Sequence, residues 1–272
     1  MFMRIKNISK PKVSILIVNY NNSLFLKRCI TSVLKQDYDN KEIVVVDDQS
    51  SDNSFNILKK FKNKIILLKN NKEKFYVGAY DQMNAYKTAL QKSSGEIIFF
   101  LDSDDFFAYN KLKRMVNYFE KNQEDNIFMD RPIIFYNKNK KVKLTKRLRG
   151  NFLIPWPRFS PQSCISVRRD YLGKIYKIIS IKKFPTIWLD FRIVIFNFIK
   201  NKKINLVNEF LTSYQQSESS ASSNYKLFSK NWWVRRHEAH NYFNYINKKI
   251  NKKKHYSLDF FITNFFIFFF CK

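Results

Sequence analysis

The sequence contains little glycine and proline, with 4 and 6 residues of these types among 272. Collagen-like chains and chains dominated by loops need more of both, so these architectures are excluded. The three cysteines, Cys29, Cys164 and Cys271, lie far apart, and none belongs to a CxxC pair. They predict free thiols in a reducing compartment rather than a disulfide framework.

Long apolar segments are also missing. Residues 1–11 include basic side chains but no long apolar region, so we expect no secretory signal. The aromatic run 260–271 is interrupted by Thr263 and Asn264, and it is shorter than the roughly 20 residues that span a bilayer. Lysines precede it between residues 248 and 254. We therefore expect it either to lie at an anionic membrane surface or to pack on the protein body.

Acidic residues are scarce, with 22 Asp and Glu against 50 Lys and Arg, which gives a formal net charge of +28. Nucleic acid, an anionic membrane face and a phosphorylated substrate all match such a charge. The lysines are spread along the chain among many Asn, Ile and Phe residues. Compositional drift explains most of them, so the charge alone selects no partner.

The N-terminal half alternates between two kinds of apolar pattern. Short β-branched runs predict buried strands, and apolar residues at helical spacing predict helices between them. The predicted strands are 13–19, 42–47, 65–68 and 96–102, and the predicted helices are 24–35, 54–61, 78–93 and 110–121. This alternation indicates an α/β fold with a mostly parallel sheet covered by helices on both faces. After residue 119 the pattern is irregular, with expected strands at 127–136 and 163–167 and expected helices at 187–199 and 225–254.

Clusters of acids follow two of these strands. Asp47 and Asp48 end one strand, and Asp102, Asp104 and Asp105 follow another within the run Phe-Phe-Leu-Asp-Ser-Asp-Asp. Ligands of open α/β sheets bind at the carboxyl ends of the strands. Two carboxylates one residue apart can share Mg²⁺ or Mn²⁺ and link it to nucleotide phosphates. The alternative is a turn or a helix N-cap, where Asp is also favoured.

Four segments occur in a characteristic order: VSILIVNYNN, EIVVVDDQSSDNS, GEIIFFLDSDD and TIWLD. This series resembles the family 2 glycosyltransferases, which have the GT-A fold, closely through Phe119 and less closely after it. GxGxxG and Walker patterns are absent, which disfavours other nucleotide-binding folds. The resemblance implies a Rossmann-like GT-A domain over residues 1–215, with a nucleotide half at 12–120 and an acceptor half at 121–215. Residues 216–272 would form a helical, basic and aromatic extension at a membrane.

The resemblance also implies roles for individual residues. Tyr20 would pack on uracil, and Asp47 or Asp48 would hydrogen-bond the uracil edge. The alternative for Tyr20 is an aromatic ring in the core. Asp102 and Asp104 match the DxD pair that holds the metal, Mn²⁺ or Mg²⁺. The implied nucleotide-sugar contacts are Val18, Tyr20, Asp47, Asp48, Asp102 and Ser103.

Asp190, in TIWLD, matches the family's general base at the start of a helix. Helix N-terminal acids also occur simply to complement the helix dipole. Trp156 and Trp188 are expected to contact the acceptor sugar. The family's metal-binding Arg-x-His is replaced by Gln215 and Ser217.

A second departure concerns the phosphates of the donor. Met83-Asn84 stands where family members often have Arg-Asn. The phosphate-facing arginine is therefore missing, and Lys72, Lys74 or Lys87 is expected to replace it.

The predicted function is inverting, metal-dependent transfer of a hexose or N-acetylhexosamine. The donor is a UDP-sugar, and the acceptor is a hydroxyl of a surface glycan, either a lipooligosaccharide core or a lipid-linked oligosaccharide. The predicted location is peripheral, at the inner face of the cytoplasmic membrane, with no nucleic acid as partner. Two alternatives remain open: a basic nucleic-acid-binding protein, and a glycosyltransferase-like protein without activity.

Overall fold

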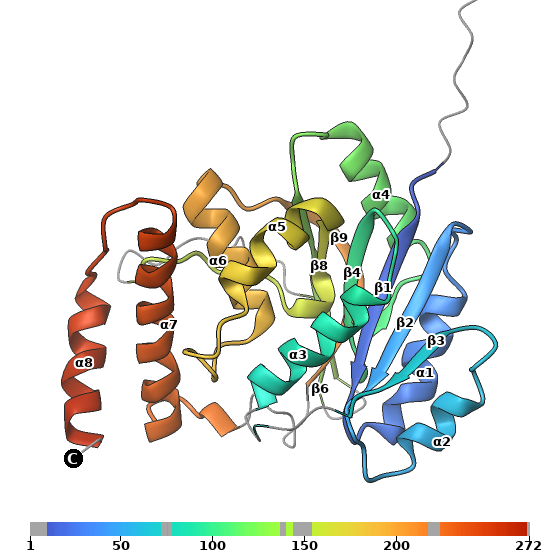
Figure 1. The fold of residues 1–272 in the computed structure, drawn as a ribbon, viewed down its shortest axis with the longest axis horizontal. Coiled ribbons are helices and arrows are strands. Elements are labelled where there is room, and N and C mark those ends of the chain that lie inside the picture. Colours follow the sequence, from blue (N-terminus) through green and yellow to red (C-terminus); the bar gives the residue numbers. More distant parts are fainter. Residues whose placement is uncertain are drawn as a thin grey trace, which may run out of the picture.

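The computed structural model describes residues 10–71, 75, 78–136, 140–143, 154–216 and 224–270 (Figure 1). Within these residues one sheet of nine strands has the order β3-β2-β1-β4-β8-β6-β9-β5, with β7 paired to β6. The parallel half consists of β1 (Val13–Asn19), β2 (Lys41–Asp47), β3 (Ile66–Lys69) and β4 (Ile97–Asp102). All of β1 is buried, as expected for a β-branched strand covered on both faces.

The register of these strands brings the predicted site residues to one edge. Asn19 lies opposite Asp47 on β2, and Val18 lies opposite Asp102 on β4. Parallel pairing aligns the carboxyl ends, so the polar residues that end β1, β2 and β4 meet there. This edge carries the candidate site.

Helices cover both faces of the sheet. One face packs against α1 (Ser23–Leu34), α2 (Ser54–Lys59) and α4 (Lys111–Lys121). The other packs against α3 (Gly78–Gln91), α5 (Arg169–Ile179) and α6 (Leu189–Asn201). The predicted fold class, a mostly parallel α/β sheet flanked by helices, is confirmed.

The second half of the sheet is mixed. Its strands are β5 (Phe106–Phe107), β6 (Ile127–Tyr136), β7 (Lys140–Lys143), β8 (Ile165–Arg168) and β9 (Leu206–Gln216). β8 is antiparallel to β4 and to β6, whereas β6 and β9 are parallel. β5 directly follows the acidic turn, the turn after β4 that contains Asp104 and Asp105. Because β5 pairs antiparallel with β9, this turn is held at both ends.

Two helices complete the fold at one end of the molecule (Figure 1). Ala239, Tyr242, Phe243 and Ile246 of α7 (Lys230–Lys249) belong to the same apolar cluster as α5 and α6. Asp259 of α8 (Leu258–Phe270) accepts hydrogen bonds from Arg236 and faces His240 at 2.6 Å, both on α7. These contacts attach α8 to α7.

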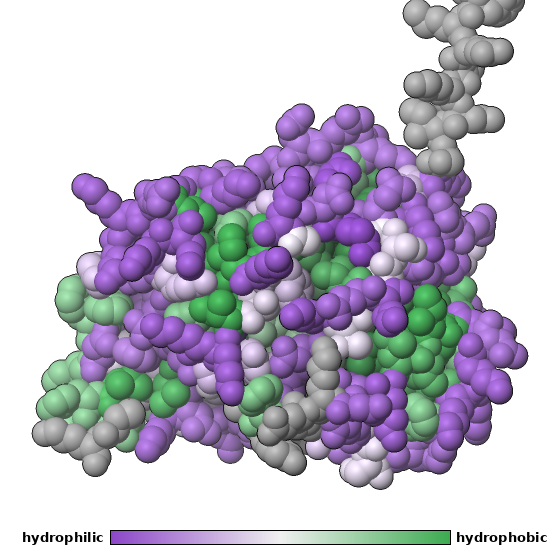
Figure 2. All heavy atoms as spheres, in the orientation of Figure 1, coloured by the Kyte–Doolittle hydropathy of each residue, from purple (hydrophilic) through white to green (hydrophobic). Residues whose placement is uncertain are grey.

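The outer surface of α8 is apolar, and Figure 2 shows this at the lower left of the molecule. Its exposed side chains are Leu258, Phe261, Ile262, Phe265, Phe266, Phe268, Phe269 and Phe270. No helix in the described part of the chain has the length and apolarity needed to cross a bilayer.

Several boundaries differ from the sequence-based expectations. The expected helix 225–254 is shorter, because Ser229 caps α7 by accepting the Trp232 amide at 3.2 Å and Asn251 is left-handed at φ 57°. The expected strand 163–167 begins at Ile165, because residues 162–164 form a 3₁₀ turn. Helix α5 and strands β5, β7 and β9 were not predicted.

Candidate active site

The acidic turn after β4 holds the first part of the site. Asp102 is the last residue of β4, and its carbonyl accepts the Asp105 amide at 3.0 Å, which closes a tight turn. Ser103 inside the turn is buried and accepts a hydrogen bond from Asn22 Nδ2 at 2.8 Å. The turn is therefore held to the loop after β1.

The Asp102 carboxylate is held by three donors. Its Oδ1 accepts from Gln82 Nε2 at 3.0 Å, from the Tyr86 hydroxyl at 3.0 Å and from Gln162 Nε2 at 3.1 Å. Burial and repulsion from Asp104 nonetheless raise the pKa of Asp102 to about 7. The turn therefore brings three carboxyl groups close to a single arginine, Arg28, and a bound cation would relieve their mutual repulsion.

Asp104 is the second predicted metal ligand. Burial raises the pKa of its carboxyl group, although the charge of Arg28 opposes this shift. Arg28 donates to the Asp104 carbonyl at 3.0 Å and lies 4.2 Å from the centre of the Phe106 ring. Oxygens of Asp102 and Asp104 fit a hard divalent cation. Within the described ranges no group of three or more His, Cys, Asp or Glu could hold a metal alone, so the remaining ligands would be substrate phosphates or water.

Asp105 has a structural role. Its carboxylate is fully buried and accepts from Ser163 Oγ at 2.5 Å and from the Gln215 amide at 2.7 Å. Burial and the neighbouring Asp104 and Asp102 raise its pKa well above the usual range. Gln215, which replaces the family's arginine, thus ties the turn to β9 through its backbone, and Gln215 Oε1 accepts from Arg28 at 3.2 Å.

The loop after β1 carries Tyr20, whose side chain is 54% exposed. The alternative that Tyr20 packs in the core is therefore wrong, and the ring is accessible to a nucleotide base. Val18 is buried at the end of β1. Stacking of Tyr20 on uracil remains a prediction.

The two acids at the end of β2 are both buried and hydrogen-bonded. Asp47 accepts from Asn19 Nδ2 at 2.9 Å and from the Ser50 amide at 3.2 Å, and so shapes the turn. Asp48 accepts from Asn70 Nδ2 at 2.5 Å. The contact of either carboxylate with uracil remains a prediction.

Asp190 lies in the first turn of α6, and its charge acts on Asp102 in the acidic turn. Burial raises its pKa, while the Phe191 amide (2.6 Å) and the charge of Arg235 lower it. Repulsion from Asp190 contributes to the raised pKa of Asp102. The fold has thus brought together the predicted base and the predicted metal ligands, which are far apart in sequence.

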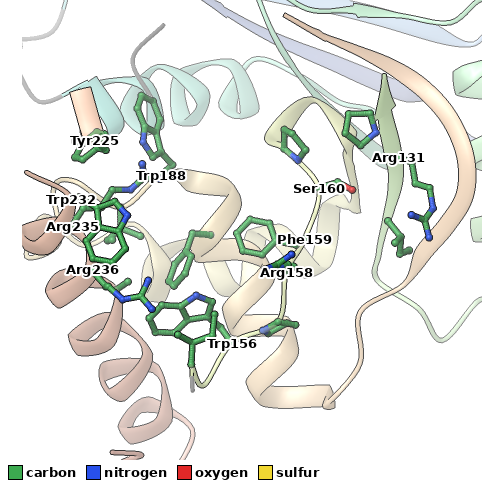
Figure 3. Close-up of a pocket in the computed structure, with 18 residues that line it drawn as sticks. Arg131, Trp156, Arg158, Phe159, Ser160, Trp188, Tyr225, Trp232, Arg235 and Arg236 are labelled. Atoms are coloured by element: carbon green, nitrogen blue, oxygen red, sulfur yellow. The ribbon is translucent and has the colours of Figure 1, made fainter. Parts of the chain in front are cut away.

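A cavity of about 590 Å³ is lined in part by Ile187, Trp188 and Phe191 at the start of α6 (Figure 3). Trp156 and Trp188, the predicted acceptor contacts, both line it. Trp188 immediately precedes α6, and Trp156 packs against Phe191 with ring centres 5.3 Å apart. Contact of these two rings with a sugar remains a prediction.

Several residues that build the site were not predicted from the sequence. Gln82, Tyr86 and Gln162 hold Asp102, and Ser163 holds Asp105. Gln82 and Tyr86 are one turn apart on α3, but their spacing is also that of an ordinary amphipathic helix. Gln162 and Ser163 belong to a turn with no sequence pattern of its own.

The suggested substitutes for the family's phosphate-facing arginine have different positions. Met83, at the place of that arginine, is a fully buried residue of α3, whereas Lys87 of the same helix is exposed. Lys72, Lys74 and Ser217 lie outside the described residues.

Two thiols lie close to the acidic turn. Cys29 Sγ is 3.8 Å from the Asp102 carbonyl oxygen, and Cys164 directly follows Ser163. Both side chains are completely buried, and burial raises the pKa of both thiols. Both are free, as predicted, whereas Cys271 lies outside the described residues.

Known proteins resemble this chain in sequence. The family described as Glycosyl transferase family 2 matches residues 14–176. The protein named UDP-Glc:alpha-D-GlcNAc-diphosphoundecaprenol beta-1,3-glucosyltransferase WfgD, from Escherichia coli, is 32% identical over 229 residues, which cover 82% of this chain and 84% of WfgD.

Solved structures support the fold. TarS 1-349 of S. aureus in complex with UDP-GlcNAc aligns with a TM-score of 0.61 at 18% identity, over 94% of this chain and 70% of that chain. The mannosyltransferase PcManGT of Pyrobaculum calidifontis, in complex with GDP-Man and Mn2+, aligns with a TM-score of 0.56 at 15% identity, over 96% of this chain and 70% of that chain. The resemblance inferred from the sequence is confirmed. Because the family match spans more than half of the chain, the chain belongs to glycosyl transferase family 2, has the GT-A fold and is a glycosyltransferase.

Proposed function

We propose that this enzyme transfers a hexose or N-acetylhexosamine from a UDP-sugar to a hydroxyl of a surface-glycan acceptor, with inversion at the anomeric carbon. One observation carries the proposal: Asp102 ends β4 at the carboxyl edge of the sheet, opposite Val18 of β1, and begins the turn that holds Ser103 and Asp104. Repulsion from Asp190 also acts on the Asp102 carboxyl group. WfgD, whose name specifies a UDP-glucose donor and a lipid diphosphate acceptor, supports the substrate class. The UDP-GlcNAc complex of TarS supports the donor nucleotide.

In this proposal the nucleotide lies along the edge formed by β1, β2 and β4. Tyr20 contacts uracil, with Val18 beneath it, and Asp47 or Asp48 contacts the edge of the base. Asp102 and Ser103 position the ribose and the diphosphate. Asp102 and Asp104 would hold Mn²⁺ or Mg²⁺, and a bound ion would supply positive charge for the departing UDP.

Asp190 acts as the general base in this proposal. Its carboxylate takes the proton of the acceptor hydroxyl while that oxygen forms a bond to the anomeric carbon. The bond between the anomeric carbon and the UDP oxygen breaks on the opposite side, which inverts the configuration. Burial raises the pKa of Asp190, and a higher pKa makes a carboxylate a stronger base.

We further propose that α8 places the enzyme at the inner face of the cytoplasmic membrane. Its exposed phenylalanines and the lysines between residues 248 and 254 combine an apolar face with positive charge. Such a combination suits an interface with anionic lipids. An acceptor carried on a lipid would be presented at that surface.

Donor binding tests the proposal directly. UDP with Mn²⁺ should raise the melting temperature, because a ligand that binds the folded state at about 100 times its Kd adds about 2.7 kcal/mol. Asp104→Asn should remove this shift, and the exposed Asp39→Asn should keep it. An unchanged shift in Asp104→Asn would exclude the DxD pair from metal-dependent donor binding.

A further inference from the structure

The three side chains that hold Asp102 all donate to the same carboxylate oxygen. Gln82 Nε2, the Tyr86 hydroxyl and Gln162 Nε2 lie at 3.0, 3.0 and 3.1 Å from Oδ1. A carboxylate has about four lone-pair sites, or about two on each oxygen, so Oδ1 is fully occupied. Among the residues that the structure describes, no group donates a hydrogen bond to Oδ2, and Asp102 is only partly buried. One oxygen of Asp102 is therefore occupied and the other is free.

The surroundings of Tyr86 fix its position. Its ring is fully buried and packs edge-on against Phe100 of β4, with ring centres 5.3 Å apart. Its hydroxyl lies 3.1 Å from the Leu101 carbonyl oxygen and shares one proton between that oxygen and Asp102 Oδ1. Rotation of the hydroxyl away from β4 would lose both acceptors inside the core, which is unfavourable.

Gln162 reaches Asp102 from the 3₁₀ turn at residues 162–164. The same turn holds the backbone of Asp102, because Ser163 Oγ accepts the Asp102 amide at 3.0 Å. Gln162 is 4% exposed, and its Oε1 is buried without a hydrogen-bond partner among the described residues. A buried acceptor without a donor is destabilising. The amide is thus oriented toward Asp102 at the expense of its own hydrogen bonding, which indicates a role beyond stability.

The occupied oxygen limits how Asp102 can bind a cation. Mg²⁺ requires near-ideal octahedral geometry, whereas Ca²⁺ accepts more ligands, including both oxygens of one carboxylate. Binding through both oxygens would require Oδ1 to give up at least one of its three donors. Binding through Oδ2 alone would leave all three hydrogen bonds in place.

We propose that Gln82, Tyr86 and Gln162 are positioning residues that leave Asp102 one free oxygen, and that this restriction makes the donor site select Mg²⁺ over Ca²⁺. The inference rests on the function proposed above, in which Asp102 and Asp104 would hold the divalent cation of the donor. The three residues act through Asp102 and do not touch the ion. The acidic turn alone would not impose this selection, because a carboxylate without these donors can bind an ion through both oxygens.

UDP binding tests the inference without any transfer reaction. Calorimetry at saturating Mg²⁺ or Ca²⁺ gives the two dissociation constants of UDP, and the wild type should bind UDP more tightly with Mg²⁺. Tyr86→Phe removes one donor and keeps the ring, and Gln162→Met removes another donor at similar volume. In both variants we expect the ratio of the Ca²⁺ constant to the Mg²⁺ constant to fall about 3- to 10-fold, because one hydrogen bond no longer opposes binding through both oxygens.

Tyr176→Phe is the matched control. Tyr176 is also buried, and its hydroxyl donates to the Met83 carbonyl of α3 at 2.8 Å, away from the acidic turn. The ratio of dissociation constants in Tyr176→Phe should equal that of the wild type. If Tyr86→Phe and Tyr176→Phe change the ratio equally, the effect comes from loosened packing of α3 and the inference is wrong.

The same measurements separate this inference from the proposed function. An unchanged ratio in Tyr86→Phe and Gln162→Met, or equal UDP affinity of the wild type with the two ions, would overturn the inference and leave the proposed function intact. Equal weakening of UDP binding with both ions would also overturn it, because Asp102 would then act on the nucleotide alone. If the wild type binds UDP equally well without any divalent cation, the metal-binding part of the proposed function fails, and the inference fails with it.

Discussion

Asp190 lies in the first turn of a helix, where an acid either interacts with the helix dipole or takes part in chemistry. Asp190→Asn keeps the volume and removes the ability to accept a proton, so we expect transfer to fall by about 10² to 10⁴. UDP–Mn²⁺ affinity should change little. Because burial raises the pKa of Asp190, transfer should decline with falling pH already above the ordinary carboxyl range. Transfer rates measured at saturating donor over a range of pH test both the loss of rate in Asp190→Asn and the decline of the wild-type rate at low pH.

Asp170 provides the control for that substitution. It is exposed in the first turn of α5, so Asp170→Asn removes a comparable helix-dipole interaction far from the acidic turn. Transfer by Asp170→Asn should remain near the wild-type rate. Near-normal transfer by Asp190→Asn would mean that another group is the base.

Lys111 is a fully buried lysine beneath the acidic turn. It pairs with Asp130 at 2.7 Å and donates to the Ser163 carbonyl at 2.7 Å. Lys111→Met would leave the Asp130 carboxylate buried without its partner, at a cost of about 3–5 kcal/mol. Lys113, on the same helix, forms an exposed pair with Asp37 at 2.8 Å, so Lys113→Met should change stability little. Urea unfolding of both variants tests this contrast, and equal losses would contradict it.

At the level of elements, prediction from sequence worked where the pattern was local. The strand from Val13 to Asn19 was predicted residue for residue, because it is a continuous buried run in which every residue except Ser14 and Asn19 is apolar. Strand β9 was missed because its buried and exposed residues do not alternate regularly, and because it contains the polar residues Asn208 and Glu209. Its pairing with β6 includes shifts in register, which no local pattern reveals.

The residues of the candidate site also fall into those that the sequence predicted and those that it did not. The acids at strand ends were visible in the sequence, since parallel strands bring their carboxyl ends together. The roles of Arg28 and Gln162 could not be seen in the sequence, because each reaches the acidic turn from a different element through long-range contacts. The arginines that line the cavity were also missed, since they come from separate segments and no spacing joins them.

Gly95, which precedes β4, is required by close packing. A Cβ at this position would lie 2.5 Å from the Ser14 backbone nitrogen, so Gly95→Ala should cost about 1–3 kcal/mol as the backbone shifts. Gly173 lies within α5, and a Cβ there meets nothing within 4 Å. Gly173→Ala should instead stabilise by about 0.5–1 kcal/mol, because alanine favours helix. Melting temperatures should therefore move in opposite directions, and a shift in the same direction would contradict this account.

At the level of the whole molecule, the exposed aromatic face of α8 predicts lipid binding. Phe265 and Phe269 are 60% and 61% exposed, so replacing both by Asn should leave the melting temperature nearly unchanged. Binding to vesicles that contain anionic phosphatidylglycerol should weaken by at least about tenfold, because two large apolar side chains no longer insert. Sedimentation with vesicles at two salt concentrations measures the effect, since added salt weakens the contribution of the lysines.

Tyr109→Asn is the control, because Tyr109 is 66% exposed beside α4, outside the C-terminal helices. Its vesicle binding should equal that of the wild type. Unchanged binding by the double variant would remove α8 from the membrane contact. Tight DNA binding with a steep salt dependence, and no response to UDP-sugars, would favour the nucleic-acid alternative.

The two buried thiols have a practical consequence for following the enzyme in time. Cys29 touches the Asp102 carbonyl, and Cys164 follows the serine that holds Asp105. An alkylating reagent can reach either sulfur only when the structure around the acidic turn opens transiently. The alkylation rates of the two cysteines therefore measure how often the structure around the acidic turn opens. A bound donor should slow the labelling of both cysteines.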